Sequence, residues 1–167
     1  MKKSVIIDTN VAIVANNRSS ATDLDCLNAC ILALTQARQQ VILMDDVHRI
    51  FIEYRRHLSH SGQPGAGDAF FRWLWNNQAN PRHCRLIAIT TLESDDADFE
   101  EFPKDAELVT FDRNDRKFVA VALASGIAPV ILNATDTDWW IYRKALERNH
   151  VHVQFLCPHR MGVNDVD

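Results

Sequence analysis

Runs of hydrophobic residues alternate along the chain with stretches in which hydrophobic and polar residues are mixed. The runs that suit strands lie at residues 4–8, 41–44, 108–111, 129–132 and 151–156, and residues 86–89 fit either a strand or the end of a helix. Short, solidly hydrophobic strands are typical of a parallel sheet that is covered on both faces.

In the mixed stretches, hydrophobic residues recur every three or four positions, which is the period of one helix face. Thr22 or Asp23 can cap a helix that runs to about Arg38, and Asp45 or Asp46 can cap a second helix from about Val47 to Leu58. The predicted buried stripes are Leu24, Leu27, Ile31 and Leu34 in the first helix and Val47, Ile50, Phe51, Tyr54 and Leu58 in the second. Further helices are predicted at residues 69–77, at 118–124 and from about 139.

Strands and helices therefore alternate, and this order predicts an α/β fold with three layers, α/β/α, around a central, mostly parallel sheet. We see no internal repeat and no linker, so residues 1–167 are expected to form a single domain. In such sheets, ligands bind beyond the carboxyl ends of the strands. Polar residues that directly follow a strand are therefore the first candidates for a site.

Composition sets broad limits on the function. Hydrophobic residues make up 47% of the chain and charged residues 24%, as in ordinary globular proteins. The net charge of −4 argues against a protein that coats nucleic acid through a broad basic face, but not against an enzyme that grips a few phosphates. The first apolar run is too short for a signal-peptide core and no run reaches the length of a membrane span, so a cytoplasmic protein is expected.

The cysteines and one acidic segment give little indication of a functional site. Cys26 and Cys30 lie four residues apart, and neither Cys84 nor Cys157 belongs to a paired C-x-x-C, so reduced and mostly buried thiols are expected rather than a zinc site. Residues 92–105 are rich in Asp and Glu, and we expect a solvated acidic loop or short helix there.

Several acids stand where strands end or helices begin. Asp8 ends the first strand, Asp115 stands at the start of the apolar helix, and Asp136 and Asp138 follow the strand at 129–132. Each of them taken alone can equally be a turn or helix cap. Thr9 and Asn10 are expected to orient Asp8, and Asp112 offers a second carboxylate one turn before Asp115.

Glu53 lies at the margin of the stripe of the second predicted helix. A carboxylate at the edge of a hydrophobic core needs a partner, because burying it unpaired is costly. An ion pair with Arg49 or Arg56 is the plain alternative to a role in a site.

Taken together, four separate segments deliver an acid to the edge of the sheet where ligands bind. Clustered carboxylates do not all stay ionised without cations, since each negative charge raises the pKa of its neighbours. Oxygen ligands without clustered Cys or His select Mg²⁺ or Mn²⁺. Carboxylates that hold such ions are the usual equipment for in-line attack of water on a phosphodiester.

The same residues resemble a known family. The opening VIIDTNVAIVA, Glu53, the stretch from Asp115 through FVAVA and the late TDTDW resemble the PIN-domain nucleases, which include the toxins of virulence-associated BC toxin–antitoxin pairs. The resemblance covers roughly residues 1–140. It departs from the family at Asn133 and Ala134, where Thr or Ser is usual, and in the longer span between residues 59 and 108.

The resemblance implies a site. Asp8, Glu53, Asp115 and Asp136 match the four metal-binding and catalytic acids of the family, Asn10 matches a supporting polar residue, and Asp138 matches a supporting or substitute ligand. Local basic residues would grip the substrate strand, although each of them can also be a solvated surface charge: Arg49, Arg56, Arg113, Arg116 and Lys117.

The expected activity is that of a Mg²⁺- or Mn²⁺-dependent nuclease, with RNA favoured over DNA because of the family. An endoribonuclease toxin would have an antitoxin partner, and the tryptophan-rich helices make a homodimer plausible. The alternative is a non-catalytic PIN-like scaffold that binds RNA or protein. A phosphatase of the haloacid-dehalogenase type is disfavoured because it needs a second Asp where this chain has Asn10.

Overall fold

The computed structural model describes residues 2–18 and 23–161, and its centre is a five-stranded sheet with the order β3-β2-β1-β6-β7. All neighbouring strands in it are parallel. The strands are β1 (Ser4–Ile7), β2 (Val41–Asp45), β3 (Cys84–Ile87), β6 (Val130–Asn133) and β7 (His152–Phe155). The order reverses at β1, so the crevice between the ends of β1 and β6 is a place where such sheets bind ligands.

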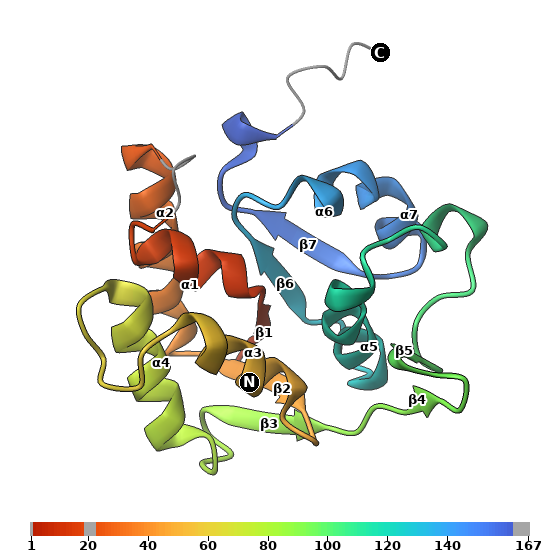
Figure 1. Ribbon diagram of the computed structural model, residues 1–167, viewed down its shortest axis with the longest axis horizontal. Helices are drawn as coiled ribbons and strands as arrows, with labels where there is room; N and C mark the ends of the chain where they lie inside the picture. The colour runs from red at the N-terminus through yellow and green to blue at the C-terminus, as the bar shows by residue number, and fades with distance from the viewer. Residues whose placement is uncertain (1, 19–22, 162–167) are drawn as a thin grey trace.

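Helices cover both faces of this sheet, as predicted (Figure 1). On one side lie α1, α2 and α4, and on the other lie α5 and α7. The helices are α1 (Thr9–Ala15), α2 (Leu24–Ala37), α3 (Arg49–His57), α4 (Ala66–Asn77), α5 (Arg116–Ala124), α6 (Thr137–Ile141) and α7 (Arg143–Arg148). Short 3₁₀ turns add η1 (Ala106–Leu108), η2 (Arg113–Asp115) and η3 (Pro158–Arg160). The chain is therefore a three-layer α/β/α structure.

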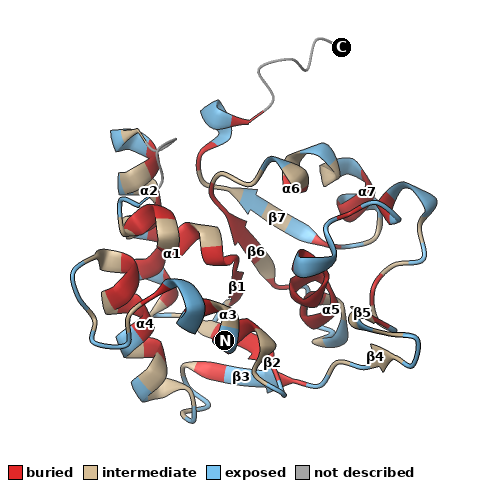
Figure 2. Ribbon diagram, in the orientation of Figure 1, coloured by how far each residue is buried: buried red, intermediate tan, exposed pale blue. Residues whose placement is uncertain are grey.

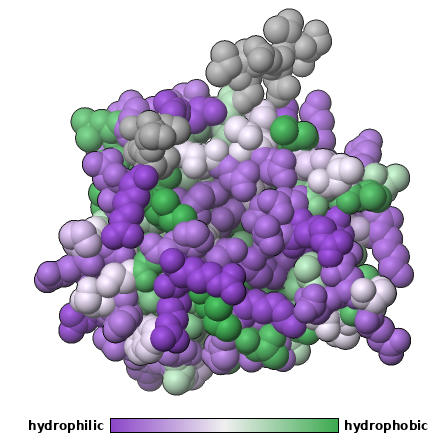
Figure 3. Space-filling view, in the orientation of Figure 1, coloured by the Kyte–Doolittle hydropathy of each residue, from purple (hydrophilic) through white to green (hydrophobic). Residues whose placement is uncertain are grey.

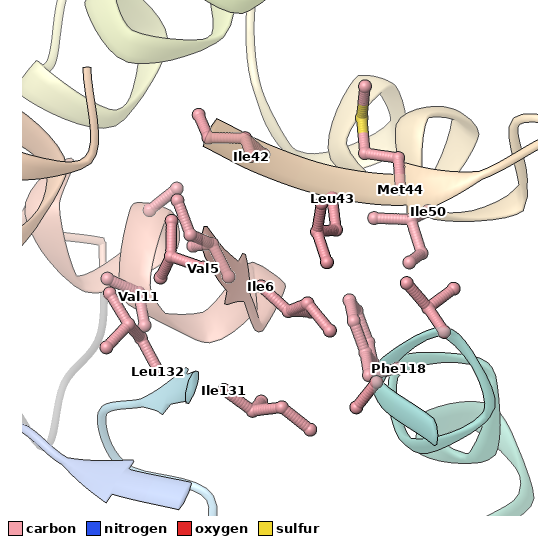
Figure 4. Close-up of a cluster of buried hydrophobic side chains, with 14 of the residues drawn as sticks. Val5, Ile6, Val11, Ile42, Leu43, Met44, Ile50, Phe118, Ile131 and Leu132 are labelled. Carbon is pink, nitrogen blue, oxygen red and sulfur yellow. The ribbon is translucent and has the colours of Figure 1, made fainter. Parts of the chain in front are cut away.

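The core lies where the strands meet the helices on each face (Figures 2 and 4). Ile6 of β1, Leu43 of β2 and Phe118 of α5 are fully buried, and Figure 4 shows them directed toward one another. Full burial of a side chain of this size stabilises the fold by about 1.5–3 kcal/mol. This packing fixes β1 and α5 relative to each other, and both elements lead into acidic residues discussed below.

The buried stripe of α2 differs from the predicted one. Leu24 is 70% exposed, and the side chains that face inward are Cys26, Cys30, Ala33, Leu34 and Ala37. Asp23 is the cap, accepting a hydrogen bond from the backbone N–H of Cys26 at 2.8 Å, whereas Thr22 lies outside the described residues. The stripe shifts because α2 packs on α1, where small side chains allow close approach of the two helices.

The helix α3 begins later than predicted. His48 is at the N-cap position without a side-chain cap bond, and the carboxylate of Asp45 accepts hydrogen bonds from the first backbone N–H groups of the helix, those of Arg49 and Ile50, each at 2.9 Å. Val47 precedes the helix and is 53% exposed, so its assignment to the buried stripe was wrong.

Two of the four cysteines are oxidised, which corrects the prediction of reduced thiols throughout. Cys26 on α2 and Cys157 after β7 form a disulfide across a Cα–Cα distance of 5.2 Å. Cys30 and Cys84 are free and buried, as predicted. The disulfide could not be predicted from the sequence because 131 positions separate the two cysteines.

The acidic segment is a hairpin rather than a loop or short helix. It contains β4 (Thr91–Leu92) and β5 (Asp95–Phe99), which pair antiparallel. Phe99 and Phe102 are buried and anchor the hairpin to the core. The many Asp and Glu residues around them led to the wrong prediction of a solvated segment. The strand predicted at 108–111 is also absent, since η1 and a turn occupy that region.

The surface carries no extended hydrophobic feature on the face drawn in Figure 3, where hydrophobic residues gather only in small groups on a hydrophilic background. Among the described residues, no helix combines the length and the apolar character that crossing a membrane requires.

Candidate metal centre

Asp8 lies at the junction of β1 and α1. It follows the buried strand directly and caps α1, with the backbone N–H of Asn10 donating to its Oδ1 at 3.3 Å. The residue is only 4% exposed, and its Oδ2 is buried without a hydrogen-bond partner among the described residues. Capping therefore uses one oxygen of Asp8 and leaves the other available to a ligand.

Asp115 and Asp136, which lie in two other segments of the chain, bring their carboxylates close to that of Asp8. Asp115 ends η2 and precedes α5, makes no side-chain cap bond and is 7% exposed. Its Oδ2 also has no partner in the described part of the chain. Asp136 caps α6 and accepts a hydrogen bond from the backbone N–H of Asp138 at 3.0 Å. One carboxylate oxygen from each of Asp8, Asp115 and Asp136 lies within 4.8 Å of the others.

This crowding appears in the acidity of the group. Burial is the main cause that raises the pKa of Asp8 to about 7, and the negative charges of Asp136 and Glu53 raise it further, against the hydrogen bond from Asn10. Burial also raises the pKa of Asp115 to about 9, followed by the charges of Asp8 and Asp136. Burial and mutual repulsion both disfavour the ionised form of these carboxylates, and a neighbouring cation would favour that form.

A divalent cation fits this arrangement. Two buried carboxylate oxygens, one on Asp8 and one on Asp115, have no partner in the portion of the chain that the structure covers, and they lie beside a third carboxylate from Asp136. An unpaired buried polar atom is costly in a folded protein, and a bound ion removes that cost. The ligand atoms are all hard oxygens, which suit Mg²⁺ or Mn²⁺ better than Zn²⁺.

Glu53 lies beside this cluster, but its carboxylate is already engaged. Lys117 Nζ donates to its Oε1 at 3.0 Å, and the Thr9 hydroxyl donates to its Oε2 in a close contact. Glu53 is near enough to Asp8 to raise the pKa of Asp8. The alternative considered for Glu53, an ion pair with Arg49 or Arg56, does not form, and Lys117 is the partner instead.

The ends of β1 and β6 are joined by side chains. Asn10 Nδ2 donates to Asn133 Oδ1 at 2.7 Å, and Asn10 Oδ1 accepts from the backbone N–H of Ala134 at 2.8 Å. Asn133 Nδ2 in turn donates to the backbone carbonyl of Asp136 at 3.0 Å. This chain of hydrogen bonds sets the position of Asp136 relative to Asp8. Asn133, where the sequence departs from the PIN pattern, thus takes a direct part in building the site.

The remaining predicted acids flank the cluster. Asp112 is exposed and caps η2 through the backbone N–H of Asn114 at 2.9 Å, while its charge contributes to the raised pKa of Asp115. Asp138 has a raised pKa, chiefly through burial and then through the charge of Asp136, but it is not one of the three carboxylates that meet.

The predicted basic residues divide into two kinds. Arg116 is 8% exposed, pairs with Asp98 at 2.8 Å and donates to the backbone carbonyl of Val109 at 2.8 Å. Its guanidinium thus already binds protein groups, and nothing in these contacts favours the predicted role of Arg116 in gripping substrate. Arg113 is exposed but forms a close ion pair with Asp95 of the hairpin.

The two basic residues on α3 are more accessible. Arg49 is partly exposed, pairs with Asp45 at 3.6 Å and packs over the ring of Phe99. Arg56 is exposed and has no ion pair within the described chain. Because Arg56 is three residues after Glu53, both side chains lie on the same side of the helix.

Two residues that support the site gave little sign in the sequence. Tyr54 is fully buried and its hydroxyl donates to the backbone carbonyl of Ile7 in a close contact, which fixes the end of β1 just before Asp8. Trp139 is fully buried against Phe111 and Phe118, and its indole lies beside Asp8, where it lowers the pKa of that carboxyl against the larger, opposite effect of burial.

Comparison with models of known protein families, with curated proteins and with solved structures finds no match for this chain.

Proposed function

We propose that the chain is a Mg²⁺- or Mn²⁺-dependent nuclease of the PIN-domain type that hydrolyses phosphodiester bonds in RNA. The observation that carries this proposal is the meeting of three carboxylates from separate segments, two of them with a buried oxygen that accepts no hydrogen bond from the described residues. Asp8, Asp115 and Asp136 would hold the ion. When bound, it would supply a Lewis acid for the phosphate and lower the pKa of a water molecule.

The other residues of the site have roles that follow from their contacts. Glu53, held by Thr9 and Lys117, presents a negative charge beside the three carboxylates and can orient the attacking water. Asn10 and Asn133 hold Asp136 in place. Arg56, on the side of α3 that carries Glu53, is the basic residue best suited to a phosphate of the substrate strand.

The preference for RNA, the role as a toxin with an antitoxin partner and the assignment to the cytoplasm rest on the resemblance and on composition. A homodimer stays a prediction as well. The Cys26–Cys157 disulfide argues against the cytoplasm, because reducing compartments seldom maintain such bonds.

The proposal is tested by cleavage of end-labelled single-stranded RNA, and of DNA of the same sequence, with Mn²⁺, with Mg²⁺ and with excess EDTA. We expect metal-dependent cleavage that leaves a 5′-phosphate and a 3′-hydroxyl, and a loss of at least about 100-fold in rate for Asp8→Asn, the scale of removing one group that stabilises transition-state charge. Asp96→Asn, which removes an exposed carboxylate of the hairpin, is the matched control.

The result separates an enzyme from a non-catalytic scaffold. Equal product from Asp8→Asn and the unaltered protein would assign the activity to a contaminant. Binding of RNA without cleavage at high protein concentration would favour the scaffold.

A further inference from the structure

The position of Lys117 is unusual for a residue next to a metal-binding carboxylate. It lies two residues after Asp115, in the first turn of α5, and is only 9% exposed. Its Nζ contacts Glu53 Oε1 at 3.0 Å, donates to the backbone carbonyl of Asn114 in a close contact, and lies 4.9 Å from the centre of the Phe118 ring. The ammonium is therefore held in one place and does not project toward solvent.

Glu53 has no oxygen left without a partner. Oε1 accepts from Lys117 and Oε2 accepts from the hydroxyl of Thr9, which is itself buried. By contrast, one oxygen of Asp8 and one of Asp115 are buried and find no partner within residues 2–18 and 23–161. The site thus has two halves: three carboxylates, two of which keep a buried oxygen without a partner among the described residues, and a fourth carboxylate that is paired with Lys117.

We propose that the ammonium of Lys117 takes the place that a second divalent cation would have beside Glu53, so that the centre binds a single divalent ion through Asp8, Asp115 and Asp136. This inference rests on the proposed function, since it concerns the same metal centre. A fixed positive charge at 3.0 Å from Glu53 repels a further cation there, and the partial burial of the pair strengthens that repulsion. Lys117 is then a positioning residue, which acts on the reaction through Glu53 and not by gripping substrate.

The number of bound ions tests the proposal without reference to cleavage. We would titrate the protein with Mn²⁺ by calorimetry and record the electron paramagnetic resonance spectrum of the loaded protein. Two Mn²⁺ ions at about 3.5–4 Å, the spacing of two-metal sites, couple magnetically and are distinguished from isolated ions on the surface. The unaltered protein should bind one ion in the centre and show no coupled pair.

Three variants sharpen the result. Lys117→Met should release Glu53 and produce the spectrum of a coupled pair, whereas Lys117→Arg keeps the positive charge and should keep a single ion. Lys144→Met, which removes an exposed lysine of α7, should behave as the unaltered protein. Glu53→Gln should weaken Mn²⁺ binding by at most about tenfold, the low end of the range for residues that are not ligands.

A coupled pair in the unaltered protein would overturn the inference while leaving the proposed nuclease intact. So would a single ion in folded Lys117→Met, or the loss of Mn²⁺ binding in Glu53→Gln. If Lys117→Met does not fold, the unaltered protein and Lys117→Arg still decide the question. No binding of Mn²⁺ or Mg²⁺ to the unaltered protein would end both the inference and the proposed function.

Discussion

Asn10 and Asn133 are separated by 123 positions in the chain, yet the Nδ2 of Asn10 donates to the Oδ1 of Asn133 at 2.7 Å. This contact bridges the ends of two neighbouring strands at the edge where the carboxylates meet. It couples the helix cap at Asp8 to the loop that carries Asp136.

The bridge predicts a specific effect of Asn10→Ala. The backbone N–H of Ala134 and the side chain of Asn133 lose their partner, which costs about 1–3 kcal/mol of the free energy of unfolding for buried polar groups. Mn²⁺ affinity should fall by about 10- to 100-fold, as for other residues that orient ligands. Denaturant titration and calorimetry measure the two effects. Asn28→Ala, an exposed change on α2, is the control, and an unchanged Mn²⁺ affinity in Asn10→Ala would contradict the bridge's role.

The raised pKa values predict an unusual pH dependence of the metal-free protein. Asp8 and Asp115 have pKa values of about 7 and about 9 in the folded state, against an ordinary value of 3.8. The folded protein therefore holds protons that the unfolded chain has released, and its stability falls as the pH rises from about 4 toward 9. Denaturant titrations in EDTA at pH 5 and pH 8 should show the lower stability at pH 8.

The same reasoning gives Asp115→Asn an unexpected sign. At pH 8 the folded protein keeps this buried carboxyl protonated while the unfolded chain has released the proton, which costs stability, and an amide has no such cost. In EDTA at pH 8 we therefore expect Asp115→Asn to raise the free energy of unfolding by at least about 1 kcal/mol, somewhat less than the about 1.4 kcal/mol of a single pKa unit. Asp96→Asn should have little effect. If Asp115→Asn is less stable at pH 8 and its stability depends on pH as that of the unaltered protein does, Asp115 does not have a raised pKa in the folded state.

Metal binding should reverse this instability. At a Mn²⁺ concentration of about 100 times Kd, a ligand that binds only the folded state adds about 2.7 kcal/mol. For a chain of 167 residues this corresponds to a rise in Tm of about 5–10 °C. Differential scanning calorimetry with and without EDTA measures the rise, which should be absent in Asp8→Asn. An equal rise in both proteins would place the bound ions elsewhere.

Substitution of Arg116 should lower the stability of the fold, whereas substitution of Arg56 should weaken RNA binding. Arg116→Met leaves Asp98 without its ion-pair partner, and we expect a loss near the low end of the about 3–5 kcal/mol typical of breaking buried pairs, because Asp98 is partly exposed. Arg56→Ala should leave stability unchanged but weaken RNA binding and reduce the slope of its salt dependence by about one. Binding titrations at several salt concentrations test this, and an unchanged slope would remove Arg56 from the interface.

The disulfide predicts a sensitivity to reductant. Cys26 and Cys157, which are 131 positions apart, close a large loop, and opening it should lower the free energy of unfolding by about 2–5 kcal/mol. Denaturant titration with and without dithiothreitol measures this loss. In Cys26→Ser the reductant should have no further effect, and a loss of similar size there would point to another cause.

The layers of the fold and the three acids that meet were predictable because they follow from local order. An acid that follows a solid apolar strand, as Asp8 directly follows β1 and Asp136 comes three residues after β6, lies at a known edge of the sheet. Residues adjacent in sequence carry that information.

The partners of these acids were not predictable, since they depend on contacts between distant segments. Glu53 lies 64 residues from Lys117, and the sequence offered nearer arginines for the same carboxylate. The face of α2 was misjudged for a related reason, because the tight packing on α1 selects cysteines and alanines over the larger leucines. In the hairpin, two buried phenylalanines outweigh the surrounding acids.

The Cys26–Cys157 bond also divides the sheet topologically. The covalent ring that it closes contains β2, β3, β6 and β7, whereas β1 and α1 precede Cys26 and lie outside it. The central strand is therefore threaded between its neighbours without being covalently enclosed. A pulling force on the segment before Cys26 would extract β1, and Asp8 with it, while the ring limits how far the remaining strands can separate.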